Sequence, residues 1–189
     1  MSSATAVSRA RVSMTAFTAV RAVLAAVLAI VTTFTGTPLH TAGFGLIVFG
    51  AFAIAQGLVV AGGTRSFAVS RAGRSLHLLR ALLLVVVGVL SLSLAAGAST
   101  GALLTAEAIG FLGSGALEVL AGLRRADSTA ASRDLVTVGG LELVVGAMLA
   151  IILPDAIFAV GVLSAWGAVV AVYLGIAAVS IARREKVSA

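Results

Sequence analysis

The chain of 189 residues contains no cysteine, few charged residues and few aromatic residues. Without cysteine it can form no disulfide and offers no thiolate for catalysis or metal binding. Charged residues make up 11% of the chain, against about 25% in a typical soluble domain. Hydrophobic residues make up 60%, and the mean hydropathy is +1.18. This composition argues against a water-facing exterior and predicts an integral membrane protein.

Six apolar runs are long enough to cross a bilayer, which takes about 20 helical residues. They cover residues 15–35, 43–61, 77–97, 101–123, 136–153 and 156–182. The first run is longer than the core of a secretory signal, and no small-x-small cleavage site precedes Pro38. We therefore expect it to be retained as the first span of an all-α membrane protein.

The breaks between the runs alternate between short and long, which predicts three helical hairpins. Short breaks cover 35–41, 97–100 and 153–156, and long breaks cover 62–77 and 124–134. The short breaks hold no Lys or Arg, and Asp155 and nearby Glu107 are the only charges at that end. The basic residues flank the other ends: Arg9, Arg11, Arg65, Arg71, Arg74, Arg124, Arg125, Arg133, Arg183, Arg184 and Lys186. The positive-inside rule then predicts a plasma-membrane protein with both termini cytoplasmic.

The three hairpins read as copies of one unit with a period close to 58 residues. The first helix reads "RAVLAAVLAI" from Arg21 and "RALLLVVVGVL" from Arg80. The turns come at Pro38, Gly97 and Pro154. We expect one membrane domain over 1–189, with repeats at about 15–66, 75–126 and 133–186. Each repeat has two crossings and the same orientation, so the repeats are parallel, related by an axis along the membrane normal, and suggest a pseudo-threefold bundle.

Small residues recur every seven positions on the second helix of each hairpin. The stretch "GFGLIVFGAFAIAQG" does not resemble a phosphate loop, because no strand precedes it and no Lys follows it. Small residues allow helix backbones to approach closely in lipid. We therefore expect the second helices to form the inner contact surface. The packing positions are Gly43, Gly50 and Gly57, then Ala108, Gly115 and Gly122, then Gly161, Ala168 and Gly175.

Four charged residues fall inside the runs, in the cytoplasmic third of the bundle: Arg21, Arg80, Glu118 and Glu142. Charges at this depth cost about 2.5–3.5 kcal/mol each on insertion and usually mark partners or pathways. Buried Arg–Glu pairs that fix helix register are the favoured interpretation. Arginines that snorkel to headgroups and a proton or ion pathway remain alternatives. The polar residues that could continue a pathway outward are few: Thr105, Ser114 and Ser164.

The ends that face the short turns carry His40, Glu107 and Asp155. Free histidine side chains titrate near pH 6.5 and carboxylates near pH 4, so an exposed rim of these residues gains positive charge on acidification. A histidine in a wetted turn and two carboxylates that follow ordinary topology explain the same residues. His40 and His77 lie on opposite sides of the predicted membrane, so we expect no metal site. No motif predicts a cofactor or a catalytic nucleophile.

The repeat pattern resembles the HdeD-type acid-resistance membrane family. The resemblance covers residues 15–186. Its motifs are the openings Arg21-Ala22 and Arg80-Ala81, the turns at Pro38, Gly97 and Pro154, and the second-helix signature Ala108…Gly115-Ala116-Leu117-Glu118 that ends in Arg124-Arg125. It implies six spans built as three short hairpins, in an inner-membrane protein tied to acid stress in some bacteria. No enzymatic activity is established for that family.

Together these patterns predict a non-enzymatic protein of the bacterial inner membrane with a structural or interaction role in stress or acid tolerance. Its expected partners are the lipid bilayer and either further copies of itself or other membrane proteins, and no nucleic acid. A passive channel or transporter for protons or a small solute is an alternative. An accessory subunit of a larger membrane complex is another.

Overall fold

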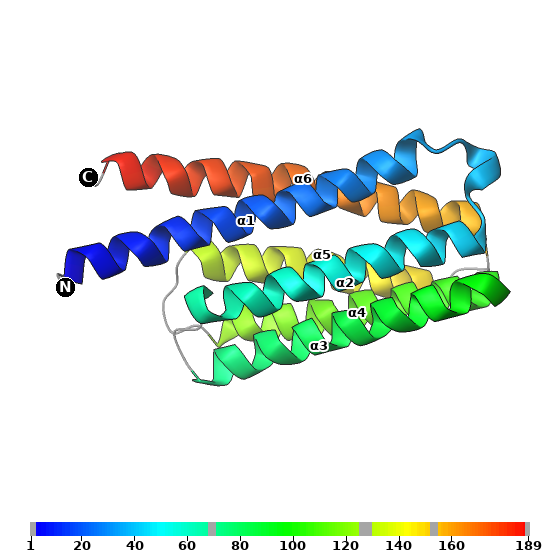
Figure 1. Ribbon diagram of the computed structural model, residues 1–189, viewed down its shortest axis with the longest axis horizontal. Coiled ribbons are helices and arrows are strands. Elements are labelled where there is room, and N and C mark those ends of the chain that lie inside the picture. Colours follow the sequence, from blue (N-terminus) through cyan, green and yellow to red (C-terminus); the bar gives the residue numbers. More distant parts are fainter. Residues whose placement is uncertain (1–2, 68–70, 125–129, 152–154, 188–189) are drawn as a thin grey trace.

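The computed structural model describes residues 3–67, 71–124, 130–151 and 155–187, and these residues are almost entirely helical (Figure 1). The helices are α1 (Ser3–Phe34), α2 (Ala42–Phe67), α3 (Arg71–Leu94), α4 (Thr100–Leu123), α5 (Ala130–Ile151) and α6 (Ala156–Val187), with short 3-10 helices at Thr37–Leu39 and Ala95–Gly97. No strand occurs in these ranges.

All six helices are long and apolar enough to cross a membrane. The candidate spans are Met14–Phe34, Ala42–Thr64, Ala72–Gly97, Thr100–Leu123, Ser132–Ile151 and Ala156–Arg183. The prediction of an all-helical chain with six membrane-length helices is therefore confirmed, with ends that differ by a few residues. The turn predicted at Pro154 lies outside the described residues. So do the side chains of Arg9, Arg11, Arg65, Arg71, Arg125, Arg184 and Lys186.

Local signals explain where the second helix of each hairpin begins. Pro38 lies in the first turn of the 3-10 helix before α2, where its missing N–H costs nothing. Ser99 is the N-cap of α4 and its hydroxyl accepts a hydrogen bond from Ala102 N at 3.1 Å. Asp155 Oδ1 accepts one from Phe158 N at 2.9 Å at the start of α6. Such caps satisfy N–H groups that the first helical turn leaves free.

The most extensive helix contacts join α2 with α3, α4 with α5, and α6 with α1. In Figure 1, α1 and α6 run side by side, and α1 begins at the same end of the bundle at which α6 finishes. A hydrogen bond of 2.6 Å between the Thr33 and Ser164 hydroxyls joins these two helices. The helices α2, α4 and α6 also contact one another. The hairpins predicted from the break lengths are thus not the most closely packed pairs.

Pairs of glycines explain two of the close contacts. A Cβ built on Gly50 would lie 2.8 Å from the Gly88 carbonyl oxygen, between α2 and α3. A Cβ built on Gly115 would lie 2.6 Å from the Gly139 carbonyl oxygen, between α4 and α5. Real Cβ atoms essentially never approach an oxygen so closely, so the backbones touch only because both positions are glycine. Other predicted packing residues also face a neighbouring helix: Gly43, Gly57, Ala108 and Gly122.

The packing positions predicted on α6 are wrong. Gly161 and Ala168 are exposed, and a Cβ built on Gly161 or Gly175 would meet no neighbouring atom within 4 Å. The close approach to α1 is made instead at Gly167, where a Cβ would lie 3.0 Å from the Ala25 carbonyl oxygen. The predicted position Ala168 lies one residue after Gly167, the position that contacts α1. One residue rotates a helix face by about 100°, which turns the predicted positions away from α1.

Aromatic rings fill the centre of the bundle. The Phe111 ring lies 4.9 Å from Trp166 and 5.8 Å from Phe49, and the Phe52 ring lies 5.4 Å from Trp166, measured between ring centroids. These residues come from α2, α4 and α6, and they belong to one buried cluster. We refer to these four residues as the aromatic layer. The outward faces carry large exposed hydrophobic side chains, including Val23, Ile30, Leu82, Val86, Val144 and Val172.

Candidate functional site

The four charged residues inside the apolar helices form one connected cluster. Arg21 Nη1 lies 2.7 Å from Glu118 Oε1, and Arg80 Nη2 lies 2.8 Å from Glu118 Oε2. Arg80 Nη2 also lies 3.0 Å from Glu142 Oε1. The side chains are almost fully buried, with Arg21 at 4%, Arg80 at 1% and Glu118 at 0% exposure. Glu118 bridges both arginines, so the arrangement is a single network rather than two separate pairs. We refer to these four residues as the charge cluster.

Four helices supply the charge cluster: α1 carries Arg21, α3 carries Arg80, α4 carries Glu118 and α5 carries Glu142. Ser114 lies one turn before Glu118 on the same face of α4. Its hydroxyl accepts a hydrogen bond of 2.8 Å from Arg80 Nε. Arg80 therefore contacts two carboxylates and one hydroxyl, and it is held from both α4 and α5.

The glycine pair between α4 and α5 makes room for the two carboxylate side chains. A Cβ built on Gly115 would lie 2.9 Å from the Glu142 Cβ, and one built on Gly139 would lie 3.0 Å from the Glu118 Cβ. Each glycine thus faces the glutamate of the other helix. Because the two backbones touch here, both carboxylates reach the same Arg80 guanidinium. Packing and electrostatics are therefore coupled at this level of the bundle.

The formal charges of the charge cluster cancel. Isolated charges are very costly to bury, whereas paired and hydrogen-bonded charges can be tolerated. The pairing is incomplete at one end, where Arg21 Nε and Nη2 have no hydrogen-bond partner among the described residues. The Phe17 ring covers this guanidinium, with 5.6 Å between the Arg21 Cζ and the ring centroid. The arginines point into the bundle, which does not fit the snorkelling interpretation.

The three residues predicted at the outer rim have different surroundings. His40 is partly exposed, lies with its Nε2 3.3 Å from the Thr35 hydroxyl, and stacks on Phe44. Asp155 is exposed and caps α6. Glu107 is 0% exposed inside α4, so its assignment to an exposed rim is wrong. The sequence held a signal for this, because Leu103, Glu107 and Phe111 follow the i, i+4 spacing of one helix face.

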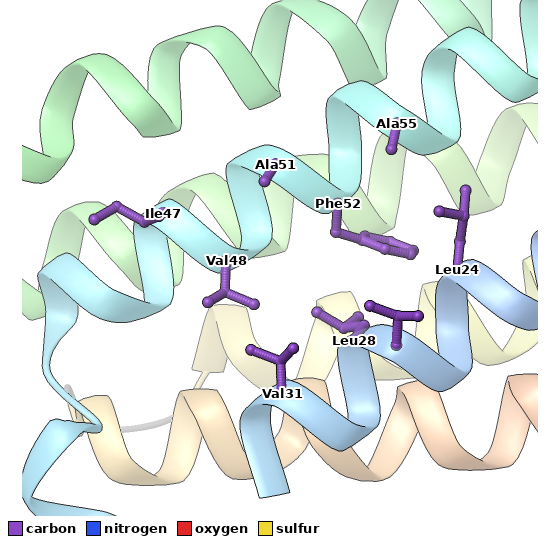
Figure 2. Close-up of a pocket in the computed structure, with 9 residues that line it drawn as sticks. Leu24, Leu28, Val31, Ile47, Val48, Ala51, Phe52 and Ala55 are labelled. Atoms are coloured by element: carbon purple, nitrogen blue, oxygen red, sulfur yellow. The ribbon is translucent and has the colours of Figure 1, made fainter. Parts of the chain in front are cut away.

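A cleft of about 290 Å³ opens between α1 and α2 (Figure 2). In Figure 2, Leu24, Leu28 and Val31 of α1 face Val48 and Phe52 of α2. The complete lining is apolar: Leu24, Val27, Leu28, Val31, Ile47, Val48, Ala51, Phe52 and Ala55. Such a cleft offers no group for acid–base or nucleophilic chemistry. The helices of this hairpin also contact each other less extensively than α1 contacts α6.

No group of three or more His, Cys, Asp or Glu side chains in the described part of the chain could hold a metal ion. Comparison with known proteins gives no further guide. No family model, no curated protein and no solved structure matches the chain.

Proposed function

We propose that the chain is a six-span integral membrane protein whose role is structural or one of interaction, and not enzymatic. The observation that carries this proposal is the electrically neutral charge cluster, which joins α1, α3, α4 and α5. In lipid, helices gain little from apolar burial, and close packing and polar contacts between helices matter more. The charge cluster and the glycine pairs supply both, while exposed apolar side chains face outward.

The bundle is proposed to consist of three parallel hairpin repeats. The contacts between α2 and α3, α4 and α5, and α6 and α1 support this, because each joins the second helix of one hairpin to the first helix of another. Positions that correspond to one another in the three hairpins also support the repeat arrangement. Gly50 faces α3 and Gly167 faces α1, while Ala108, 58 residues after Gly50 and 59 before Gly167, is buried.

The proposed location is the inner membrane of a bacterium, with both termini in the cytoplasm. The arginine-rich segments at one end of the bundle support this orientation under the positive-inside rule. The resemblance to HdeD-type proteins supports a contribution to acid or stress tolerance. Further copies of the chain or other membrane proteins are its proposed partners.

Cysteine labelling is expected to detect the proposed topology. The chain has no cysteine of its own, so single cysteines can be placed without a background. Gly97→Cys lies in a short turn and Arg124→Cys lies at the other end, and both positions are exposed. A membrane-impermeant maleimide should label Gly97→Cys in intact spheroplasts and Arg124→Cys only after permeabilisation. Labelling of both variants before permeabilisation, or the reverse order, would contradict the topology.

Flux measurements are expected to separate a structural role from transport. Proteoliposomes with proton or small-solute gradients should leak no faster than protein-free liposomes, because the charge cluster is closed by its own ion pairs. Incorporation of the protein must be verified in the same vesicles. Robust flux that Glu118→Gln abolishes would overturn the structural proposal in favour of a channel or transporter.

A further inference from the structure

Glu107 is a buried acidic side chain of the bundle interior that does not belong to the charge cluster. It is 0% exposed, and both of its carboxylate oxygens are buried without a hydrogen-bond partner among the described residues. It lies in the eighth position of α4, whose first residue is Thr100. By contrast, Glu118 and Glu142 each face an arginine within 3.0 Å. The two kinds of glutamate therefore have opposite surroundings.

No charged group of the neighbouring helices compensates Glu107. The helices that pack most on α4 are α2, α3, α5 and α6. α1 reaches α4 through Arg21, which is held at Glu118, eleven residues or roughly 16 Å of helix away from Glu107. The nearest basic residue along α3 is Arg80, which is held at Ser114, seven residues or roughly 10 Å of helix away from Glu107. His77 lies a further turn away on α3, and Glu142 contacts Arg80.

The remaining titratable groups on these helices lie nearer the cytoplasmic end proposed above. On α3 they are Arg71 and Arg74, and on α5 they are Arg133 and Asp134. On α6 they are Tyr173, Arg183, Arg184, Glu185 and Lys186. The Tyr173 hydroxyl donates a hydrogen bond of 2.9 Å to Asp134 Oδ1. The membrane span of α2, Ala42–Thr64, carries no charged residue. Among the described residues, Glu107 therefore has neither an ion pair nor a hydrogen-bond partner for its carboxylate oxygens.

Glu107 lies one helical turn before the aromatic layer on α4. Phe111 lies one turn along α4 on the same face as Glu107, and its ring contacts both Phe49 and Trp166. The repeat spacing points to the same level, because Glu107 follows Phe49 by 58 residues and precedes Trp166 by 59. Trp166 Nε1 is a further buried polar atom without a hydrogen-bond partner in the described chain. One carboxyl group therefore takes the place of an aromatic ring among the three central helices.

An ionised carboxylate in such surroundings would cost many kcal/mol, and a proton removes that cost. We propose that Glu107 is a proton-binding site, which holds its proton as a neutral carboxylic acid within the aromatic layer. The proposal rests on the membrane arrangement proposed above. In the same bundle, Glu118 and Glu142 each have an arginine guanidinium within 3.0 Å, and Glu107 has none among the described residues.

A neutral carboxylic acid inside an apolar bundle can react with a hydrophobic carbodiimide. A hydrophobic carbodiimide takes up the acid proton on one nitrogen while the carboxyl oxygen bonds to its central carbon. The O-acylisourea that forms can rearrange to a stable N-acylurea on the same side chain. The reaction is an addition without a leaving group, so the protein gains the mass of one reagent molecule. The carboxylates of Glu118 and Glu142 are already engaged by arginine, so they are less available to the reagent.

The test treats the protein in native membranes with dicyclohexylcarbodiimide and locates the adduct by mass spectrometry. The expected result is one adduct on Glu107, its complete loss in Glu107→Gln, and no adduct on Glu118 or Glu142. A water-soluble carbodiimide of the same functional group should leave Glu107 unmodified. Absence of the Glu107 adduct, or equal modification of all three glutamates, would overturn the proposal.

A stability measurement tests the same site without chemical modification. Gln is a neutral mimic of the protonated acid, so Glu107→Gln should unfold at a midpoint close to that of the wild type. A large drop in the midpoint would show that Glu107 is ionised, and would overturn the proposal. The cysteine-labelling test separates the two proposals. If the labelling contradicts the proposed topology but the purified, folded protein still forms the Glu107 adduct, only the membrane arrangement is rejected and the proton-binding site stands.

Discussion

Glu118→Gln is expected to destabilise the folded bundle by about 3–5 kcal/mol, the cost of removing one partner from a buried ion pair. The reason is that Glu118 contacts both arginines, and Arg21 has no other ion pair among the described residues. The substitution leaves a net positive charge buried between α1, α3 and α4. Unfolding in a mild detergent, followed by helical circular dichroism, measures the loss.

Two further variants test whether the loss of stability comes from the arginine charge left unpaired. Glu142→Gln should lower the free energy of unfolding by less than Glu118→Gln, because Arg80 still contacts Glu118 and the Ser114 hydroxyl. The double variant Arg21→Met with Glu118→Gln restores neutrality and should recover part of the loss. Wild-type stability of Glu118→Gln would show that the charge cluster does not hold the helices together. A double variant less stable than the single one would also contradict this account.

Gly115→Ala is expected to destabilise the bundle by about 1–3 kcal/mol, the usual cost of overpacking a well-packed interior. The added Cβ would lie 2.6 Å from the Gly139 carbonyl oxygen, which cannot move aside as a flexible side chain could. The helices α4 and α5 must then separate, and that separation moves Glu118 and Glu142 away from Arg80. The same unfolding measurement reports the effect.

Gly161→Ala is the matched control, because a Cβ there would meet no neighbouring atom within 4 Å. Ala is a better helix former than Gly by roughly 1 kcal/mol, so this variant should be unchanged or more stable. The two alanine substitutions should therefore have effects of opposite sign. Equal destabilisation would mean that the α6 positions predicted from the sequence do pack, contrary to the contact made by Gly167.

Local features of the sequence predicted the helices well. Each helix was recognisable as an uninterrupted apolar run, because a membrane-length helix needs only its own composition to be identified. The caps at Ser99 and Asp155 follow from residue type and position in the same way. The candidate charges were also visible, since any charge inside an apolar run is unusual.

Relations between helices could not be predicted as well. The predicted ladder on α6 is misplaced by one residue, because Ala168 follows Ala108 by 60 residues whereas the contacting Gly167 follows it by 59. Nothing local in the sequence distinguishes Gly167 from Gly161 or Gly175. Glu107 was assigned to an exposed rim because it is near the end of a run. Only the packing of α2, α4 and α6 around it reveals that its carboxyl group is enclosed.

The sequence by itself determined that the protein has six apolar helices, the approximate limits of their apolar parts, and which charges are embedded in them. The tertiary structure alone decided that α6 packs on α1, that Glu118 bridges Arg21 and Arg80, and that Glu107 has no cation beside it. The physical reason is the range of the interactions. Hydropathy and capping act within a helix, whereas ion pairing and close packing depend on residues tens of positions apart.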